Sequence, residues 1–264
     1  MKNKIAIIGG GNLGSAIAKG LLKSEKNKPE NITITRRKTE KLIELQKKGV
    51  TVTSNNKYAV KNAEIIILAV KPKSIDTILH EIKNEIKGKI LISVVTGISI
   101  NHIISLLDNK NVTLFRAMPN TAIAIQESMT CISTNNGDDT QIEKVKQIFD
   151  QLGKTIFINE DLIDASTVLA ACGIAYALRF IRAASQGGIE IGFDASTAQA
   201  IASQTVKGAA SLLIEEGLHP EQEIDKVTTP RGITIAGLNE MEHKGFSSSL
   251  IKGILTSFEN ITKK

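Results

Sequence analysis

Aromatic residues, cysteine and histidine are scarce in this chain of 264 residues. Trp is absent, two Tyr and seven Phe amount to 3% of the sequence, and there are two Cys and four His. Proteins that bind single-stranded nucleic acid need aromatic side chains on which bases stack, and zinc sites need clustered Cys and His. We therefore expect neither a nucleic-acid partner nor a metal site.

The sequence also lacks paired cysteines and a long apolar run in its C-terminal half. Cys131 and Cys172 are isolated in the sequence and form no CxxC motif. Isolated cysteines of this kind are typical of reduced thiols in the cytoplasm. The longest charge-free apolar stretch there, residues 165–178, is shorter than the ~20 residues that a membrane span needs. These absences predict a cytoplasmic protein without a membrane segment.

What the sequence does contain is a globular composition with a moderate basic excess. Hydrophobic residues make up 42% and charged residues 23%, and 33 Lys and Arg against 27 Asp and Glu give a net charge of +6. The cations are spread along the chain, which suits an anionic small ligand better than a nucleic acid.

Short apolar runs recur through the first 160 residues and predict buried strands. They lie at residues 5–8, 32–35, 65–70, 90–95, 112–115, 129–133 and 155–158. Amphipathic stretches between most of them predict helices, for example at 13–22, 38–48, 74–86 and 141–152. This alternation is typical of a doubly wound parallel sheet, so we expect an α/β, Rossmann-like domain over residues 1–159.

The composition changes after residue 158, where strand-like runs stop and Ala, Gly, Ser and Thr dominate. Residues 160–264 are therefore predicted to form an all-helical domain, with turns at His219-Pro220 and Thr229-Pro230. Small residues on long helices permit close helix packing. From the sequence alone, that packing fits a bundle within one chain or a dimer equally well.

The first motif with chemical meaning is Gly9-Gly10-Gly11-Asn12-Leu13-Gly14, which fits G-x-G-x-x-G. It follows a predicted strand and precedes a predicted helix, the context in which Gly9, Gly11 and Gly14 bring backbone amides up to a pyrophosphate. The motif predicts a dinucleotide site.

The end of the second predicted strand indicates which dinucleotide binds. NAD sites usually place a carboxylate there, but this chain has Thr35-Arg36-Arg37-Lys38. Guanidinium groups suit a ribose 2′-phosphate, so NADPH is the expected cofactor, with NADH as the alternative. A solvated basic start to a surface helix also fits these residues.

Three further loops complete the pattern. Ala69-Val70-Lys71-Pro72 and Met118-Pro119-Asn120-Thr121 leave the carboxyl ends of predicted strands, where such sheets bind ligands. A loop in the helical half, Thr229-Pro230-Arg231-Gly232-Ile233-Thr234, precedes a predicted helix and can offer amides to a carboxylate. On spacing alone, the first two loops fit ordinary turns equally well, and the third fits a helix–helix connector better than a ligand site.

Together these elements, with Asp164-Ala165, resemble the pyrroline-5-carboxylate reductase family in order and spacing along the whole chain. The resemblance implies NAD(P)H-dependent reduction of 1-pyrroline-5-carboxylate to L-proline, by a homodimer or larger homo-oligomer joined through the helical domain. By position, it assigns cofactor contacts to Gly9, Gly11, Asn12, Leu13, Gly14, Thr35, Arg36, Arg37, Asn56, Ala69, Val70 and Lys71. It assigns substrate contacts to Thr229, Gly232, Ile233 and Thr234, with the Thr234 hydroxyl orienting the ring nitrogen as the catalytic residue.

The sequence departs from the family pattern at two places. Ala170-Ala171-Cys172-Gly173-Ile174 stands where the family has Ser-Gly-Ser-Gly-Pro, and Arg231 replaces a family Gly. Two alternatives therefore stay open: a related NADP-dependent reductase of another imine or keto acid, and a non-catalytic NADP(H)-binding regulatory protein.

Overall fold

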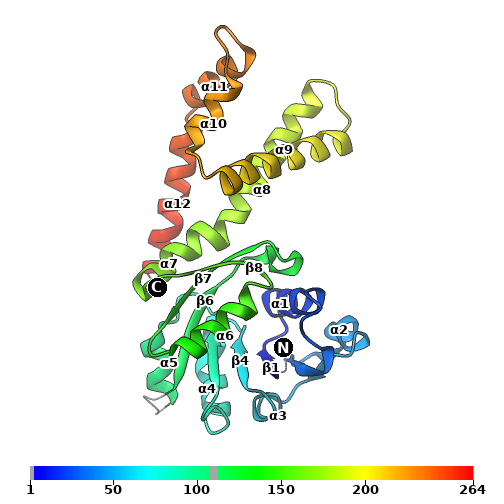
Figure 1. The fold of residues 1–264 in the computed structure, drawn as a ribbon, viewed down its shortest axis with the longest axis vertical. Helices are drawn as coiled ribbons and strands as arrows, with labels where there is room; N and C mark the ends of the chain where they lie inside the picture. The colour runs from blue at the N-terminus through cyan, green and yellow to red at the C-terminus, as the bar shows by residue number, and fades with distance from the viewer. Residues whose placement is uncertain (1–2, 108–111, 264) are drawn as a thin grey trace. The chain divides into compact units, whose positions relative to one another are not determined.

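The computed structural model describes residues 3–107 and 112–263. Contacts between Cα atoms divide the chain into a sheet unit, Met1–Cys172 with Phe258–Lys264, and a helical unit, Gly173–Ser257 (Figure 1). The division falls after Cys172 rather than at the predicted 159/160 boundary. The first helical residues after the sheet pack on it, since Ile163 is buried against Met118 and Cys131.

The sheet unit is built on one eight-stranded sheet in the order β3-β2-β1-β4-β5-β6-β7-β8. Neighbouring strands are parallel except β6 and β7, which are antiparallel. The strands are β1 (Ile5–Ile8), β2 (Ile32–Thr35), β3 (Thr51–Thr53), β4 (Ile65–Leu68), β5 (Ile90–Ser93), β6 (Thr113–Met118), β7 (Ser128–Thr134) and β8 (Gly153–Phe157).

Helices cover both faces of this sheet because the strand side chains alternate between two apolar cores. Ile5 and Ile7 join the core under α1, α2 and α6, whereas Ala6 and Ile8 join the core under α3, α4 and α5. The helices are α1 (Asn12–Lys23), α2 (Ile43–Lys47), α3 (Asn56–Lys61), α4 (Ile75–Ile82), α5 (Ile100–Leu107) and α6 (Asp139–Phe149). Short 3₁₀ helices are Pro29–Asn31, Thr39–Leu42, Pro72–Ser74, Thr121–Ile125 and Glu160–Leu162.

The predicted doubly wound α/β fold is confirmed, with three differences. The three-residue edge strand β3 was not predicted, because two of its residues are Thr and it is too short to show a period. The run predicted to end at Phe115 continues through Arg116 to Met118. Strand β7 runs antiparallel to β6, since the link at residues 119–127 is shorter than the dozen residues that a parallel crossover needs.

The helical unit has few buried side chains of its own. After α7 (Ile163–Ser166) and a π-helical turn (Thr167–Cys172), it comprises α8 (Gly173–Glu190), α9 (Ala195–Glu216), α10 (Pro220–Val227), α11 (Ile233–His243) and α12 (Phe246–Thr262), whose end belongs to the sheet unit. Among its described residues, the buried ones are Ser185, Ala198 and Ala202. The predicted helical C-terminal half is confirmed.

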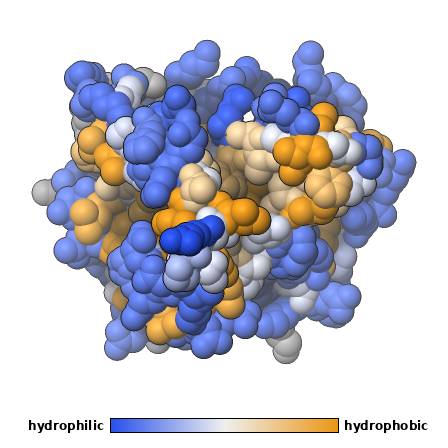
Figure 2. Space-filling view, turned by 90° about the horizontal axis from the view of Figure 1, so that it is seen from above, coloured by the Kyte–Doolittle hydropathy of each residue, from blue (hydrophilic) through white to orange (hydrophobic). Residues whose placement is uncertain are grey.

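Large apolar side chains remain at the surface of the helical unit. They include Leu178 (59% exposed), Ile191 (78%), Ile214 (74%) and Ile251 (57%), and Figure 2 shows apolar groups in orange at the surface. By length and composition alone, the helical run Glu160–Glu190 would be long enough to cross a membrane, although the sequence predicted no such segment. Exposed apolar helices of this kind also occur where a second subunit packs.

Candidate active site

The glycine loop follows β1 at the carboxyl edge of the sheet, beside the loop that follows β4. Gly9 has φ +110°, and a Cβ there would lie 2.4 Å from the Ala69 carbonyl oxygen and 2.7 Å from Val70 Cγ1. The Ala69 N–H donates to the Ile8 carbonyl at 2.8 Å. The structure thus brings together two of the predicted cofactor segments, 9–14 and 69–71, and only Gly fits at their contact.

The first turn of α1 presents backbone amides at this edge. Gly11 is the N-cap, no side chain among the described residues caps the helix, and a Cβ on Gly11 would meet nothing within 4 Å. Gly14 is different, since its Cβ would lie 2.0 Å from the Gly9 carbonyl oxygen. The helix therefore begins at an exposed site, where Gly11 and Asn12 are exposed and Leu13 is half-buried. Its free N–H groups fit a pyrophosphate.

The end of β2 is hydrogen-bonded to the glycine loop. The Gly10 N–H donates to the Thr35 carbonyl at 2.6 Å, and the Gly9 N–H donates to Thr35 Oγ1 at 3.2 Å. The Arg36 guanidinium donates through Nη1 to the Gly10 carbonyl. Thr35 is buried, Arg36 is half-buried, and Arg37 is exposed. Arg36 thus contacts the glycine loop, whereas Arg37, the next residue, is exposed.

Asn56 and Lys71 occupy the remaining predicted cofactor positions. Asn56 opens α3 and is half-buried, and its Nδ2 donates to Glu81 Oε2 at 2.9 Å. Lys71 is exposed and precedes Pro72, which begins a 3₁₀ helix. The amide nitrogen of Asn56 is therefore occupied by a carboxylate on α4, whereas the Lys71 side chain faces solvent.

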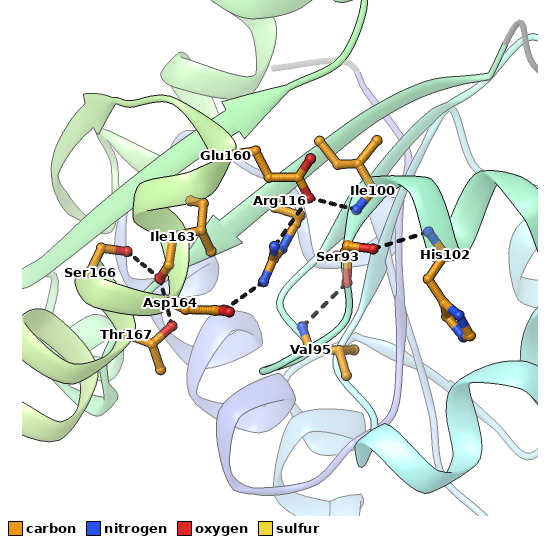
Figure 3. Close-up of polar contacts among 11 residues, drawn as sticks. Ser93, Val95, Ile100, His102, Arg116, Glu160, Ile163, Asp164, Ser166 and Thr167 are labelled. Atoms are coloured by element: carbon orange, nitrogen blue, oxygen red, sulfur yellow. Dashed lines mark hydrogen bonds and ion pairs between the residues drawn. The ribbon is translucent and has the colours of Figure 1, made fainter. Parts of the chain in front are cut away.

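A charge cluster around the buried Arg116 was not predicted from the sequence (Figure 3). The Arg116 side chain on β6 is 4% exposed and forms ion pairs of 3.1 Å with Glu160 Oε1 and with Asp164 Oδ1. Glu160 Oε1 also accepts the Ile100 N–H at the start of α5, at 2.6 Å. The sequence feature that could have revealed this cluster is an Arg within an apolar strand, because a buried guanidinium needs anionic partners.

Asn120, in the loop after β6, contacts the π-helical turn. Its Nδ2 donates to the Ala170 carbonyl at 3.2 Å, and its Oδ1 accepts the Ala122 N–H at 3.0 Å. In a π-helical turn, hydrogen bonds that span five residues replace those that span four. This change can leave a carbonyl without a donor inside the helix, and a side-chain amide such as that of Asn120 can then donate to it. The segment 160–172 is thus fixed to β6 through Arg116 and to the following loop through Asn120.

The predicted substrate loop lies in the helical unit, between α10 and α11. The Gly232 N–H donates to the Thr229 carbonyl at 2.8 Å, and a Cβ on Gly232 would lie 2.5 Å from Thr229 Oγ1. Arg231 is exposed and left-handed, with φ +59°, a conformation that explains why Gly suits this position. Ile233 and Thr234 are exposed in the first turn of α11, and Gly232 caps it without a side-chain hydrogen bond among the described residues.

Cys131 is buried in the sheet unit, and Cys172 is half-buried. Burial raises the pKa of the Cys131 thiol, outweighing the opposite effect of its hydrogen bond with Ser166, so this thiol stays protonated. No group of three His, Cys, Asp or Glu within residues 3–107 and 112–263 is arranged to hold a metal ion.

Comparisons with known proteins match both halves of the chain. The family model "Pyrroline-5-carboxylate reductase dimerisation" matches residues 160–263, and "NADP oxidoreductase coenzyme F420-dependent" matches residues 4–97. Pyrroline-5-carboxylate reductase 2 of Dictyostelium discoideum is 45% identical over 98% of this chain and 92% of its own length. Reductase 1 of that organism is 50% identical over 97% of this chain, which spans 48% of that longer protein.

A solved structure agrees with these sequence matches. Plasmodium falciparum pyrroline carboxylate reductase, determined with NADP bound, is 26% identical and superimposes with a TM-score of 0.91 over 99% of this chain and 98% of that chain.

Proposed function

This chain belongs to the pyrroline-5-carboxylate reductase family, and on that premise we propose that it reduces 1-pyrroline-5-carboxylate to L-proline. Its cofactor is NAD(P)H, and we propose NADPH as the preferred form. The observation that carries the proposal is the open glycine loop with a basic turn beside it, in a chain that also carries the family's substrate loop.

In this proposal the sheet unit binds the cofactor. The N–H groups of Gly11, Asn12 and Leu13 hold the pyrophosphate, with Gly9 and Gly14 giving the loop its shape. Thr35, Arg36 and Arg37 surround the adenosine ribose, and Asn56 lies farther along the same edge. Ala69, Val70 and Lys71 flank the nicotinamide, and the bound cofactor supplies the hydride that reduces the C=N bond.

The helical unit supplies the substrate contacts. We place the substrate carboxylate at the N–H groups of the loop formed by Thr229, Gly232 and Ile233, where the start of α11 favours negative charge. The Thr234 hydroxyl orients the ring nitrogen. A Thr hydroxyl is a weak acid at neutral pH, so the proton comes from solvent or from an imine that is already protonated.

The assembly we propose is a cytoplasmic homodimer formed through residues 160–264, with residues 1–159 as the NADP(H)-binding domain. Apolar side chains exposed on α8, α9 and α12, such as Leu178, Ile214 and Ile251, support a second copy as the partner. A dimer would cover the apolar run 160–190 without a membrane.

One assay tests the activity. NADPH absorbance is followed after 1-pyrroline-5-carboxylate is added to the purified protein, with NADH in parallel and proline measured as product. Rapid oxidation of NADPH with equimolar proline is the expected result. Oxidation with another imine but not with this substrate would indicate a related reductase, and tight NADPH binding without turnover of any imine would indicate a non-catalytic binder.

A further inference from the structure

Arg36 and Arg37 are adjacent cations at the end of β2, but the structure gives them different surroundings. Arg36 is half-buried, its N–H donates to the Thr53 carbonyl at 3.0 Å, and its Nη1 donates to the Gly10 carbonyl. Arg37 is exposed, and within the described part of the chain no hydrogen bond or ion pair involves its side chain. Arg36 is thus held at both its backbone and its side chain.

The contact between Arg36 and Gly10 is one of three hydrogen bonds that join the end of β2 to the glycine loop. The other two come from the Gly9 and Gly10 N–H groups and end on Thr35. Gly10 immediately precedes Gly11, the N-cap whose surroundings are open. Any group that fixes the Gly10 carbonyl therefore also fixes the direction of the first free N–H groups of α1.

We infer that Arg36 is a positioning residue for the glycine loop rather than a ligand of the 2′-phosphate, which leaves the 2′-phosphate contact of the proposed function to Arg37. The inference rests on the proposed function, because it assumes that a dinucleotide binds at this loop. NADH and NADPH share the pyrophosphate and differ by the 2′-phosphate. A residue that acts on the loop affects both cofactors equally, and a residue that acts on the 2′-phosphate affects one.

The chemistry of the two side chains supports this division. The planar guanidinium of Arg36 has part of its donor set directed at a neutral carbonyl that belongs to the protein. Arg37 keeps its full fork of donors available, which is the arrangement that recognises a phosphate dianion. A Lys at position 36 would keep the charge but lose the fixed geometry.

The test measures dissociation constants of both cofactors by fluorescence titration, in the wild type and in Arg36→Met, Arg36→Lys and Arg37→Met. We expect Arg36→Met to weaken NADH and NADPH binding by the same factor, about 3- to 10-fold, which corresponds to one hydrogen bond. Arg36→Lys should restore less than half of that loss on a logarithmic scale. Arg37→Met should weaken NADPH binding at least 10-fold and leave NADH binding within twofold.

Hydrogen exchange of the cofactor-free protein gives a second readout. Arg36→Met should speed exchange of the amides in residues 9–14, and Arg37→Met, the matched control, should leave it unchanged. The inference is overturned if Arg36→Met lowers NADPH affinity alone, or if exchange in the loop does not change. A wild type that binds neither cofactor would instead refute the proposed function.

Discussion

The two units of this molecule differ in how completely each one buries its own apolar surface. The sheet unit has an apolar core on each face of its sheet, with Phe115 and Phe149 fully buried. In the described helical unit, burial is limited to Ser185, Ala198 and Ala202, while side chains such as Ile191 and Ile214 are three-quarters exposed. The sheet unit therefore has the core of an independent domain, whereas the helical unit leaves large apolar side chains exposed.

The largest expected effect comes from a substitution in the glycine loop of the sheet unit. Gly14→Ala places a Cβ 2.0 Å from the Gly9 carbonyl oxygen, so backbone must move. We expect the free energy of unfolding of the sheet unit to fall by about 4 kcal/mol, at the upper end for single substitutions. Urea denaturation measures the change.

Gly11→Ala is the control for that substitution. Its Cβ meets nothing within 4 Å and its φ is −78°, so stability should be unchanged while cofactor binding weakens. Equal destabilisation by both substitutions would show that the loop's shape does not depend on the contact between Gly14 and Gly9.

The next effect concerns the helical unit, whose large apolar side chains are exposed. Leu178→Glu puts a charge on α8 at a side chain that is 59% exposed in the single chain. If a second copy covers it, association should weaken by about 3 kcal/mol, or more than 100-fold, because the charge is buried unpaired. Sedimentation equilibrium measures the dimer constant, and Leu178→Met should behave as the wild type. A dimer unaffected by Leu178→Glu would place the interface on another face.

A smaller effect is expected at the junction of the sheet with segment 160–172. Arg116→Met removes the cation shared by Glu160 and Asp164, whose side chains are 31% and 33% exposed. Because water reaches both carboxylates, we expect a loss of about 2 kcal/mol, less than for a fully buried pair. Thermal unfolding of Arg116→Met, compared with Asp164→Asn, measures it. A change below 0.5 kcal/mol, roughly that of a surface substitution, would mean that the cluster contributes no net stability.

The smallest effect has the opposite sign. The Arg231 backbone has a left-handed conformation, with φ +59°, which is costly for a residue with a Cβ. Arg231→Gly removes this cost and should stabilise the helical unit by about 1 kcal/mol. If the Arg231 charge also helps to hold the substrate carboxylate and offsets the hydroxyls missing from residues 170–174, KM for the substrate should rise severalfold. Stabilisation with an unchanged KM would leave Arg231 without a role in binding.

The sequence predicted much of the fold because periodicity and glycine spacing are local signals. Helix α1 lies within one residue of its predicted bounds at each end, and β1 and β2 match theirs. The strand predicted over residues 112–115 stopped before Arg116, whose partners Glu160 and Asp164 lie more than 40 residues away in the sequence. Such long-range pairing has no local signature.

The candidate site was predicted less completely than the fold. The spacing located Gly9, Gly11 and Gly14, and the structure explains each of them by a close approach or an open space. The sequence could not distinguish Arg36 from Arg37, since the difference depends on one carbonyl of a distant loop. It also did not predict the π-helical turn, whose small residues fit an ordinary helix equally well. The individual site roles remain predictions.

The order of the strands has a consequence for synthesis of the chain. The first five strands, β3-β2-β1-β4-β5, are neighbours in the sheet and are complete by Ser93. Because domains fold from the N-terminus as the ribosome extends the chain, this five-stranded part of the sheet can form before the helices after Gly173 emerge. In the dimer that we propose, the exposed apolar side chains of these helices are covered only after two chains, each with these strands already folded, associate.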